Sequence, residues 1–189
     1  INVEDGLEFQ TETIQGELIR EEEVYQGVRL KFIAMLGKAR IPLQVDIGFG
    51  DAVTPEPRWA EFPTLLDFPA PRLKAYPKET VVAEKFEAMV RLGLANGRMK
   101  DFWDVNYLIS EFEFDGTLVQ KAITATFESR RSAIPEKLPI ALKEEFAANE
   151  LVSGRWNAFL RRNRIEKSQN LSEIVPHIRS FFAPILEAM

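Results

Sequence analysis

The first part of the chain has the hydrophobic pattern of β-strands. Ile41 to Phe49 alternates strictly, with apolar residues at the odd positions and polar or small residues between them. Leu7 to Arg20 and Val28 to Leu36 also have strand character, and the breaks between these stretches are short. The pattern therefore predicts three consecutive strands that pair as an antiparallel meander.

A proline-rich connector and a series of helices follow. The prolines between Pro55 and Pro77 exclude a regular helix and favour an extended chain. From Glu79 onward the apolar residues recur with helical spacing. The expected helices are Glu79–Leu92, Lys100–Phe112, Thr117–Arg131, Leu142–Ala148, Leu151–Arg162 and Leu171–Glu187. Strands followed by helices predict an α+β fold, with a β-rich domain over residues 1–78 and a helical lobe over residues 79–189.

Two of the expected helices each carry a charged residue in the middle of an apolar face. At about 100° per residue, Lys85 lies among the apolar side chains of the first helix and Asp101 among those of the second. The same count places Glu87 on the solvated face. An unpaired buried charge is strongly unfavourable. Lys85 and Asp101 are therefore expected either to form a structural ion pair or to line a site, and the pattern leaves both interpretations open.

Composition excludes several classes of protein. The chain has 189 residues, 46% of them hydrophobic and 28% charged, as in an ordinary globular protein. Its net charge of −5 argues against a protein that coats nucleic acid without specificity. The absence of cysteine excludes disulfides, thiolate metal sites and cysteine nucleophiles. No apolar run approaches the roughly 18–20 residues of a membrane span, and there is no signal-peptide pattern, so we expect a cytoplasmic protein without a membrane partner.

Two stretches contain residues suited to chemistry. In DIGFGD, Asp46 has small neighbours that would let a ligand approach, and a carboxylate suits a divalent cation. The alternative for Asp46 is a solvated strand face. RMKDFWD places cations and carboxylates at the start of a helix, where basic side chains favour bound phosphate. A charged capping cluster is the alternative there, and its members are Arg98, Lys100, Asp101 and Asp104.

Other conspicuous residues have more ordinary interpretations. His177 has no nearby nucleophile or second histidine, so we expect it on the surface or in packing. Trp59, Trp103 and Trp156 are expected in the core or in contacts of the helical lobe. A basic run is expected to be either a solvated helix end or a contact to an RNA backbone; it consists of Arg155, Arg161, Arg162, Arg164 and Lys167.

Taken together, DIGFGD, PKETVVAEKFEAMVRLG and RMKDFWDVNYL resemble the AbiEii/AbiGii toxin family of nucleotidyltransferase-like proteins. The similarity runs from about Leu7 to Phe127, with a looser helical tail to Met189. Its most specific part is the AEK helix followed by an R-x-K-D-x-x-D helix. The resemblance implies a minimal nucleotidyltransferase fold, with an antiparallel or mixed sheet and a C-terminal helical lobe. It also implies the toxin half of a bacterial toxin–antitoxin pair linked to phage defence.

The resemblance further implies a reaction and roles for individual residues. Nucleotides would be transferred from a nucleoside triphosphate to RNA, with tRNA the favoured acceptor, in a reaction that uses Mg²⁺; a cognate antitoxin would be the partner. By similarity, Asp46 is the third metal-side carboxylate, Lys85 contacts the triphosphate, and Asp101 is the acid near the nucleotide. The rest of the nucleotide-binding motif is matched by Arg98, Lys100 and Asp104.

One departure from the family pattern concerns its first motif. A Gly-Ser or Gly-Gly turn followed by an Asp-x-Asp strand is absent from this sequence, and we expect it upstream of Ile1. Two of three metal carboxylates would then be missing, so residues 1–189 alone are expected to be inactive although the full-length protein would be an enzyme. The alternative is a catalytically inactive module that binds a nucleotide, RNA or the antitoxin.

Overall fold

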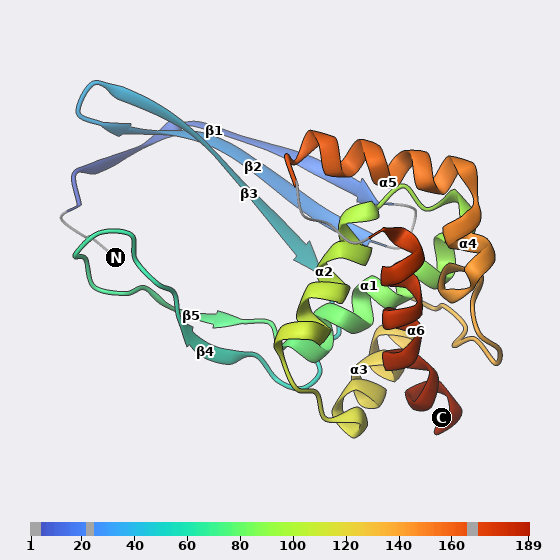
Figure 1. Ribbon diagram of the computed structural model, residues 1–189. Helices are drawn as coiled ribbons and strands as arrows, with labels where there is room; N and C mark the ends of the chain where they lie inside the picture. Colours follow the sequence, from blue (N-terminus) through green and yellow to red (C-terminus); the bar gives the residue numbers. More distant parts are fainter. Residues whose placement is uncertain (1–4, 22–24, 166–169) are drawn as a thin grey trace. The chain divides into compact units, whose positions relative to one another are not determined.

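The computed structural model describes residues 5–21, 25–165 and 170–189. Strands come first and helices second, which confirms the predicted α+β class (Figure 1). The chain divides into two compact units, Ile1–Asp51 and Ala52–Met189. The predicted boundary between residues 78 and 79 lies at the first turn of the first helix. The proline-rich connector belongs to the same compact unit as the helices.

The first unit is a three-stranded antiparallel sheet in the order β1-β2-β3. Its strands are β1 (Leu7–Glu21), β2 (Tyr25–Leu36) and β3 (Ala39–Phe49). All three were predicted, β3 from the strict alternation of apolar and polar residues and the other two from their strand character. Gly37 has a φ of 57° in the turn between β2 and β3, a conformation that favours glycine.

The alternation in the sequence correctly predicts which side chains share a face of this sheet, but it does not predict which of them are buried. The register pairs Val28 with Ile47 and Leu30 with Val45, and so places most apolar side chains of β2 and β3 on one face. Ala34 is fully buried, yet Leu18 is 71% exposed and Phe49 is 57% exposed. The pattern therefore identifies which side chains share a face without showing what covers that face.

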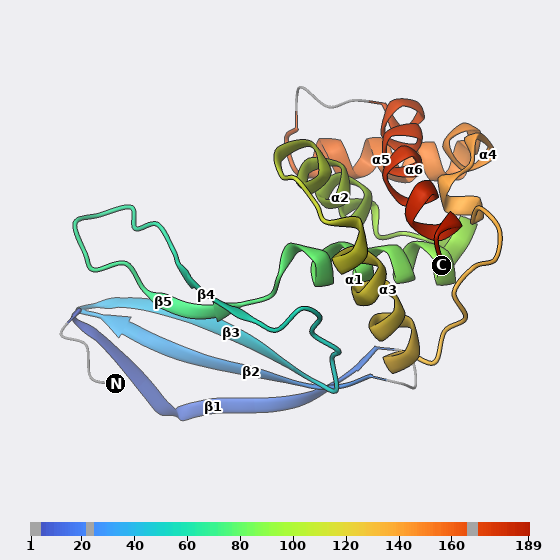
Figure 2. The same ribbon diagram turned by 90° about the horizontal axis from the view of Figure 1, so that it is seen from below.

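The connector contains two short strands that the sequence analysis missed. β4 (Arg58–Glu61) pairs antiparallel with β5 (Arg72–Ala75), and the loop 62–71 joins them. Phe62 N–H donates to the carbonyl oxygen of Pro71 at 3.0 Å, which extends the pairing. Both strands are free of proline, so the prolines exclude helix as expected but permit this hairpin (Figures 1 and 2).

The predicted helices are all present. They are α1 (Lys78–Leu92), α2 (Met99–Glu111), α3 (Gly116–Ser129), α4 (Glu144–Ala148), α5 (Glu150–Arg162) and α6 (Leu171–Glu187). Asp115 begins α3 by accepting the N–H of Thr117 at 2.8 Å. No helix in the described ranges is long and apolar enough to cross a membrane.

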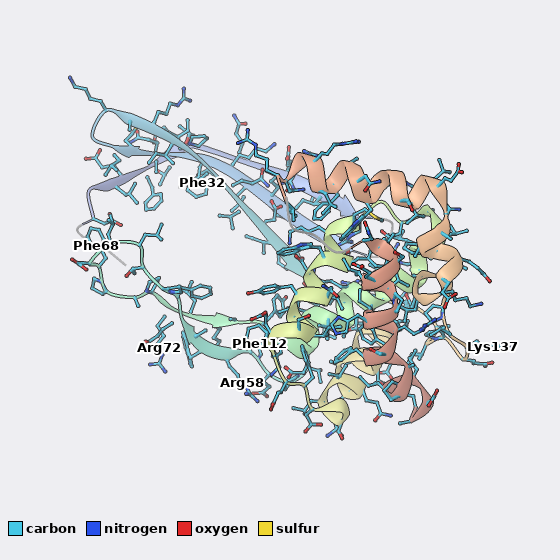
Figure 3. All side chains as sticks on the ribbon, viewed as in Figure 1. Phe32, Arg58, Phe68, Arg72, Phe112 and Lys137 are labelled. Atoms are coloured by element: carbon cyan, nitrogen blue, oxygen red, sulfur yellow. The ribbon has the colours of Figure 1, made fainter. Side chains whose placement is uncertain are left out.

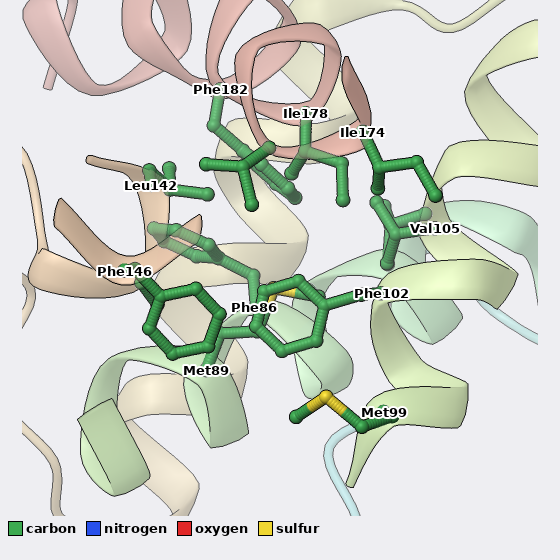
Figure 4. Close-up of a cluster of buried hydrophobic side chains, with 14 of the residues drawn as sticks. Phe86, Met89, Met99, Phe102, Val105, Leu142, Phe146, Ile174, Ile178 and Phe182 are labelled. Atoms are coloured by element: carbon green, nitrogen blue, oxygen red, sulfur yellow. The ribbon is translucent and has the colours of Figure 1, made fainter. Parts of the chain in front are cut away.

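The helices of the second unit enclose a well-packed apolar core (Figure 4). Phe86 of α1 stacks on Phe182 of α6 with ring centroids 4.2 Å apart. Phe102 of α2 stacks on Phe146 of α4 at 5.0 Å. These rings are fully buried, so α1, α2 and α6 are held in fixed relative positions. That rigidity matters because α1 and α2 carry the charged residues singled out from the sequence.

Candidate functional site

Lys85 forms the centre of a charged cluster between α1 and α2. Its Nζ lies 2.7 Å from Oδ1 of Asp101 and 2.8 Å from Oδ2 of Asp104. The side chain of Lys85 is 18% exposed and that of Asp101 is 5% exposed. The ion pair between Lys85 and Asp101, one of the two interpretations that the pattern left open, is therefore present, and Asp104 is an additional partner.

Two exposed cations at the start of α2 complete the cluster. Lys100 Nζ donates to both carboxylate oxygens of Asp104, at 2.8 and 2.6 Å. Arg98 Nε is 2.8 Å from Asp101 Oδ2, but the N–H is not aligned with that oxygen, which is buried without a hydrogen bond. We call these five residues, three cations and two carboxylates, the Lys85 cluster; its formal charge is therefore +1.

The cluster keeps Lys85 protonated. Burial acts to lower the pKa of Lys85, but hydrogen bonds to Asp101 and Asp104 and the negative charges of both outweigh it, so the pKa is raised above its ordinary value. Lys85 is therefore an ammonium at neutral pH and cannot serve as a general base. An ammonium has three N–H donors, and the two carboxylates take two of them, which leaves one for a ligand.

The connection between α1 and α2 is tied down by backbone contacts. Asn96 Oδ1 accepts the N–H of Arg98 at 2.7 Å. Arg155 Nη1, on α5, donates to the carbonyl oxygens of Leu94 at 2.8 Å and Asn96 at 3.2 Å. Neither expectation for the basic run describes Arg155, because its guanidinium holds this turn; Lys167 lies outside the described residues. α5 thus helps to position the Lys85 cluster.

Asp46 lies on β3 in the first unit and is held by a cation. Arg29 Nε and Nη2 donate to its two carboxylate oxygens, each at 2.8 Å, and Gln44 donates at 3.2 Å. The hydrogen bond from Arg29 is the main cause that lowers the pKa of Asp46 below its ordinary value. Asp46 is thus a charged carboxylate whose oxygens are already engaged.

The glycines beside Asp46 serve the chain itself. A Cβ at Gly48 would lie 2.9 Å from Oδ2 of Asp51, so the missing side chain admits that carboxylate. Among the described residues, no group of three or more histidine, aspartate or glutamate side chains could hold a metal ion. Asp46 and its neighbours therefore do not by themselves provide the ligands that Mg²⁺ needs. Asp46 and the Lys85 cluster belong to different units, and their combination in one site stays a prediction.

Glu87 corrects the sequence analysis. It was expected on the solvated face of α1, but its side chain is fully buried. Arg130 Nη1 donates to Glu87 at 2.8 Å, and Ser132 Oγ donates at 2.7 Å. Both donors lie at or beyond the end of α3, so the helical spacing of α1 gave no sign of them.

The tryptophans and the histidine have mixed outcomes. Trp156 is 2% exposed, as expected for a core residue, and Trp103 stacks on Tyr107. Trp59 of β4 is 59% exposed, so of its two expected places the core is excluded. His177 is exposed, with Nδ1 2.8 Å from Oδ1 of Asn106, in agreement with a surface residue.

Comparisons with known proteins give one family. No curated protein and no solved structure matches the chain. A family model described as "Nucleotidyl transferase AbiEii toxin, Type IV TA system" matches residues 2–182. That range contains Asp46 and every member of the Lys85 cluster. Because the match extends over nearly the entire sequence, the chain belongs to the AbiEii family of nucleotidyl transferase toxins of type IV toxin–antitoxin systems.

Proposed function

We propose that this chain acts in the transfer of a nucleotide from a nucleoside triphosphate to an RNA acceptor, and that the Lys85 cluster contacts the triphosphate. Membership of the family supports the reaction class, the use of a nucleoside triphosphate and a cognate antitoxin as partner. The RNA acceptor, with tRNA as the first candidate, the role of each residue, a place in phage defence and a cytoplasmic location belong to the proposal.

The observation that carries the proposal is the excess positive charge of the cluster. Lys85 has one N–H donor left, and within the described chain the terminal nitrogens of Arg98 make no hydrogen bond. Arg98 is 49% exposed and Lys100 is 70% exposed, so a ligand can reach both. Asp101 and Asp104 hold Lys85 in place before a ligand binds, which favours electrostatic stabilisation without reorganisation.

The proposed chemistry places these cations beside the leaving group. A hydroxyl of the RNA attacks the α-phosphorus and releases its proton to solvent, the bond to the bridging oxygen of the β-phosphate breaks, and pyrophosphate leaves with the electron pair of that bond. Lys85, Arg98 and Lys100 would offset the charge on the β- and γ-phosphates. No step is assigned to Mg²⁺, because Asp46 is engaged by Arg29 and could act as the metal-side carboxylate only by giving up that contact.

Nucleotide binding tests the proposal directly. Isothermal titration of the chain with each of the four nucleoside triphosphates should show binding that Arg98→Gln and Lys100→Gln each weaken about tenfold, the effect of losing one charge-assisted contact. Lys121→Gln is the matched control, because Lys121 is an exposed lysine of α3 that makes no ion pair in the described chain. Equal affinity for triphosphate in the unchanged chain and in all three variants would reject the role of the cluster in binding phosphate.

A second candidate function is binding without transfer. The engagement of Asp46 by Arg29 favours it, because a carboxylate held this way is not free to hold a metal. Incubation of the full-length protein with labelled triphosphate and bulk tRNA separates the two candidates. Label on the RNA supports transfer, whereas triphosphate binding without labelled RNA supports the binding module.

A further inference from the structure

The β4–β5 hairpin presents an exposed aromatic ring with two cations near it. Trp59 is paired across the strands with Lys74, and Arg72 lies two residues before Lys74 on the same face. Arg72 Cζ lies 5.4 Å from the centre of the Trp59 ring, and Lys74 Nζ lies 5.8 Å from it. With 59% of Trp59 exposed, most of the indole remains open to a ligand.

The charges on this face are not compensated. In the described chain neither Arg72 nor Lys74 makes an ion pair, unlike the cations of the Lys85 cluster. Glu61 is the cross-strand partner of Arg72 and is the carboxylate of this face, yet no ion pair joins the two. Two cations are therefore available to an anionic ligand beside a ring available for stacking.

We propose that the face formed by Trp59, Arg72 and Lys74, the Trp59 face, binds single-stranded RNA. An unstacked base would lie on the indole, while the two cations contact the flanking phosphates. RNA is favoured over a protein partner because an exposed indole beside two cations that make no ion pair in the described chain is the combination on which single-stranded nucleic acids stack and bind their phosphates. The choice of RNA rests on the proposed function, which it deepens by giving the acceptor a binding surface on the chain.

The hairpin supplies its own control. Arg58 is one residue from Trp59 and is paired with Ala75, so it belongs to the opposite face. Figure 3 shows Arg58 and Arg72 projecting from the hairpin. Arg58→Gln and Arg72→Gln each remove one positive charge from the same hairpin. A difference in RNA binding between them therefore depends on which face carries the charge and not on the net charge.

The experiment measures fluorescence anisotropy of a labelled single-stranded RNA of about 12 nucleotides, a length within the range bound by stacking platforms, with the chain and without nucleotide. We expect Trp59→Ala to weaken binding about 5- to 100-fold, the loss of one stacked base. Trp59→Phe should restore most of the affinity. Arg72→Gln should reduce the slope of log affinity against log salt by about 1, and Arg58→Gln should bind as the unchanged chain does.

Four outcomes would overturn the proposal. Equal losses in Arg58→Gln and Arg72→Gln would show attraction to net charge alone. Unchanged binding by Trp59→Ala, or no RNA binding by the chain, would leave the face to a protein partner. Preference for a duplex of the same sequence would also contradict it, because a duplex base is not free to stack on the ring.

Failure of this inference is distinguishable from failure of the proposed function. Arg98→Gln should bind the RNA normally, since the Lys85 cluster is not part of the Trp59 face. If the chain binds single-stranded RNA through Trp59 but shows neither triphosphate binding nor transfer, only the nucleotide assignment is rejected. Transfer by full-length Trp59→Ala with an unchanged KM for RNA would reject only the Trp59 face.

Discussion

At the scale of single residues, α1 carries two charges that lie partly or fully within the second unit. Lys85 and Glu87 are two positions apart on α1, and each is neutralised by a partner from another segment. The sequence predicted the first pair because both Lys85 and Asp101 interrupt an apolar face. It could not predict the second, because Arg130 and Ser132 reach Glu87 from residues that helical spacing does not connect to α1.

Removing the Lys85 ammonium should destabilise the fold. Lys85→Met leaves Asp101 and Asp104 buried without their shared cation, which should lower the free energy of unfolding by about 3 kcal/mol. Adding Asp101→Asn should recover part of that loss, because one stranded charge is removed. Urea denaturation of the single and double variants measures both effects, and a single variant as stable as the unchanged chain would contradict the buried-pair account.

Ionisation of Glu87 should make the free energy of unfolding depend on pH in the acid range. Burial acts to raise its pKa, but hydrogen bonds from Arg130 and Ser132 outweigh it, and the pKa is lowered. A lowered carboxyl pKa gives stability that is present above the unfolded-state value, about 4.3 for glutamate, and is lost as pH falls through the folded-state value. Glu87→Gln leaves Arg130 without its buried anion. The substitution should therefore lower the free energy of unfolding by about 2–4 kcal/mol at pH 7.

The difference between Glu87→Gln and the unchanged chain should shrink as the pH falls below the ordinary glutamate value. Urea denaturation at a series of pH values gives this difference directly. A constant difference across the acid range would mean that ionisation of Glu87 does not contribute to stability.

At the scale of elements, long periodic segments were predictable and short paired ones were not. Each helix predicted from apolar spacing is present. In all of them except the five-residue α4, several turns of consistent spacing outweigh any one residue. β4 and β5 have four residues each, too few to show alternation among surrounding prolines. Their pairing depends on a contact across the loop 62–71, which no local pattern contains.

The contact of α5 with the α1–α2 connection should be measurable. Arg155→Ala removes hydrogen bonds from a charged donor to the carbonyl oxygens of Leu94 and Asn96. We expect a loss of about 1–2 kcal/mol in the free energy of unfolding and faster amide exchange in the turn. Arg161→Ala is the matched control, since Arg161 is an exposed arginine of the same helix; equal effects of both substitutions would contradict the contact.

At the scale of the whole molecule, the two units differ in how each satisfies its apolar residues. The second unit has a continuous core that includes Phe86 and Phe182, whereas the first has a sheet whose apolar face is largely exposed. The order of elements predicted the α+β class. Alternation could not predict the exposure, because it shows which face is apolar and carries no information on what covers it.

Amide hydrogen exchange should reflect this difference. Amides in the middle of α1 and α3 should exchange most slowly, because both helices bury their apolar faces in the core, and amides of β1–β3 should exchange faster. Phe86→Ala should cost about 3–5 kcal/mol and should accelerate exchange in α1 and α6. Protection of the sheet equal to that of α1 would show that its apolar face is covered in solution.

The shared charge of Lys85 also constrains how the family can change over generations. A neutral replacement of the lysine leaves Asp101 with only Arg98 beside it and Asp104 with only Lys100, and a neutral replacement of either acid removes part of what offsets the desolvation of the lysine. Every single-step path away from the cluster therefore crosses an unstable intermediate. Copies of the gene that have escaped selection for toxicity should show all three positions replaced together, and a sequence with only one of them replaced should be rare and short-lived.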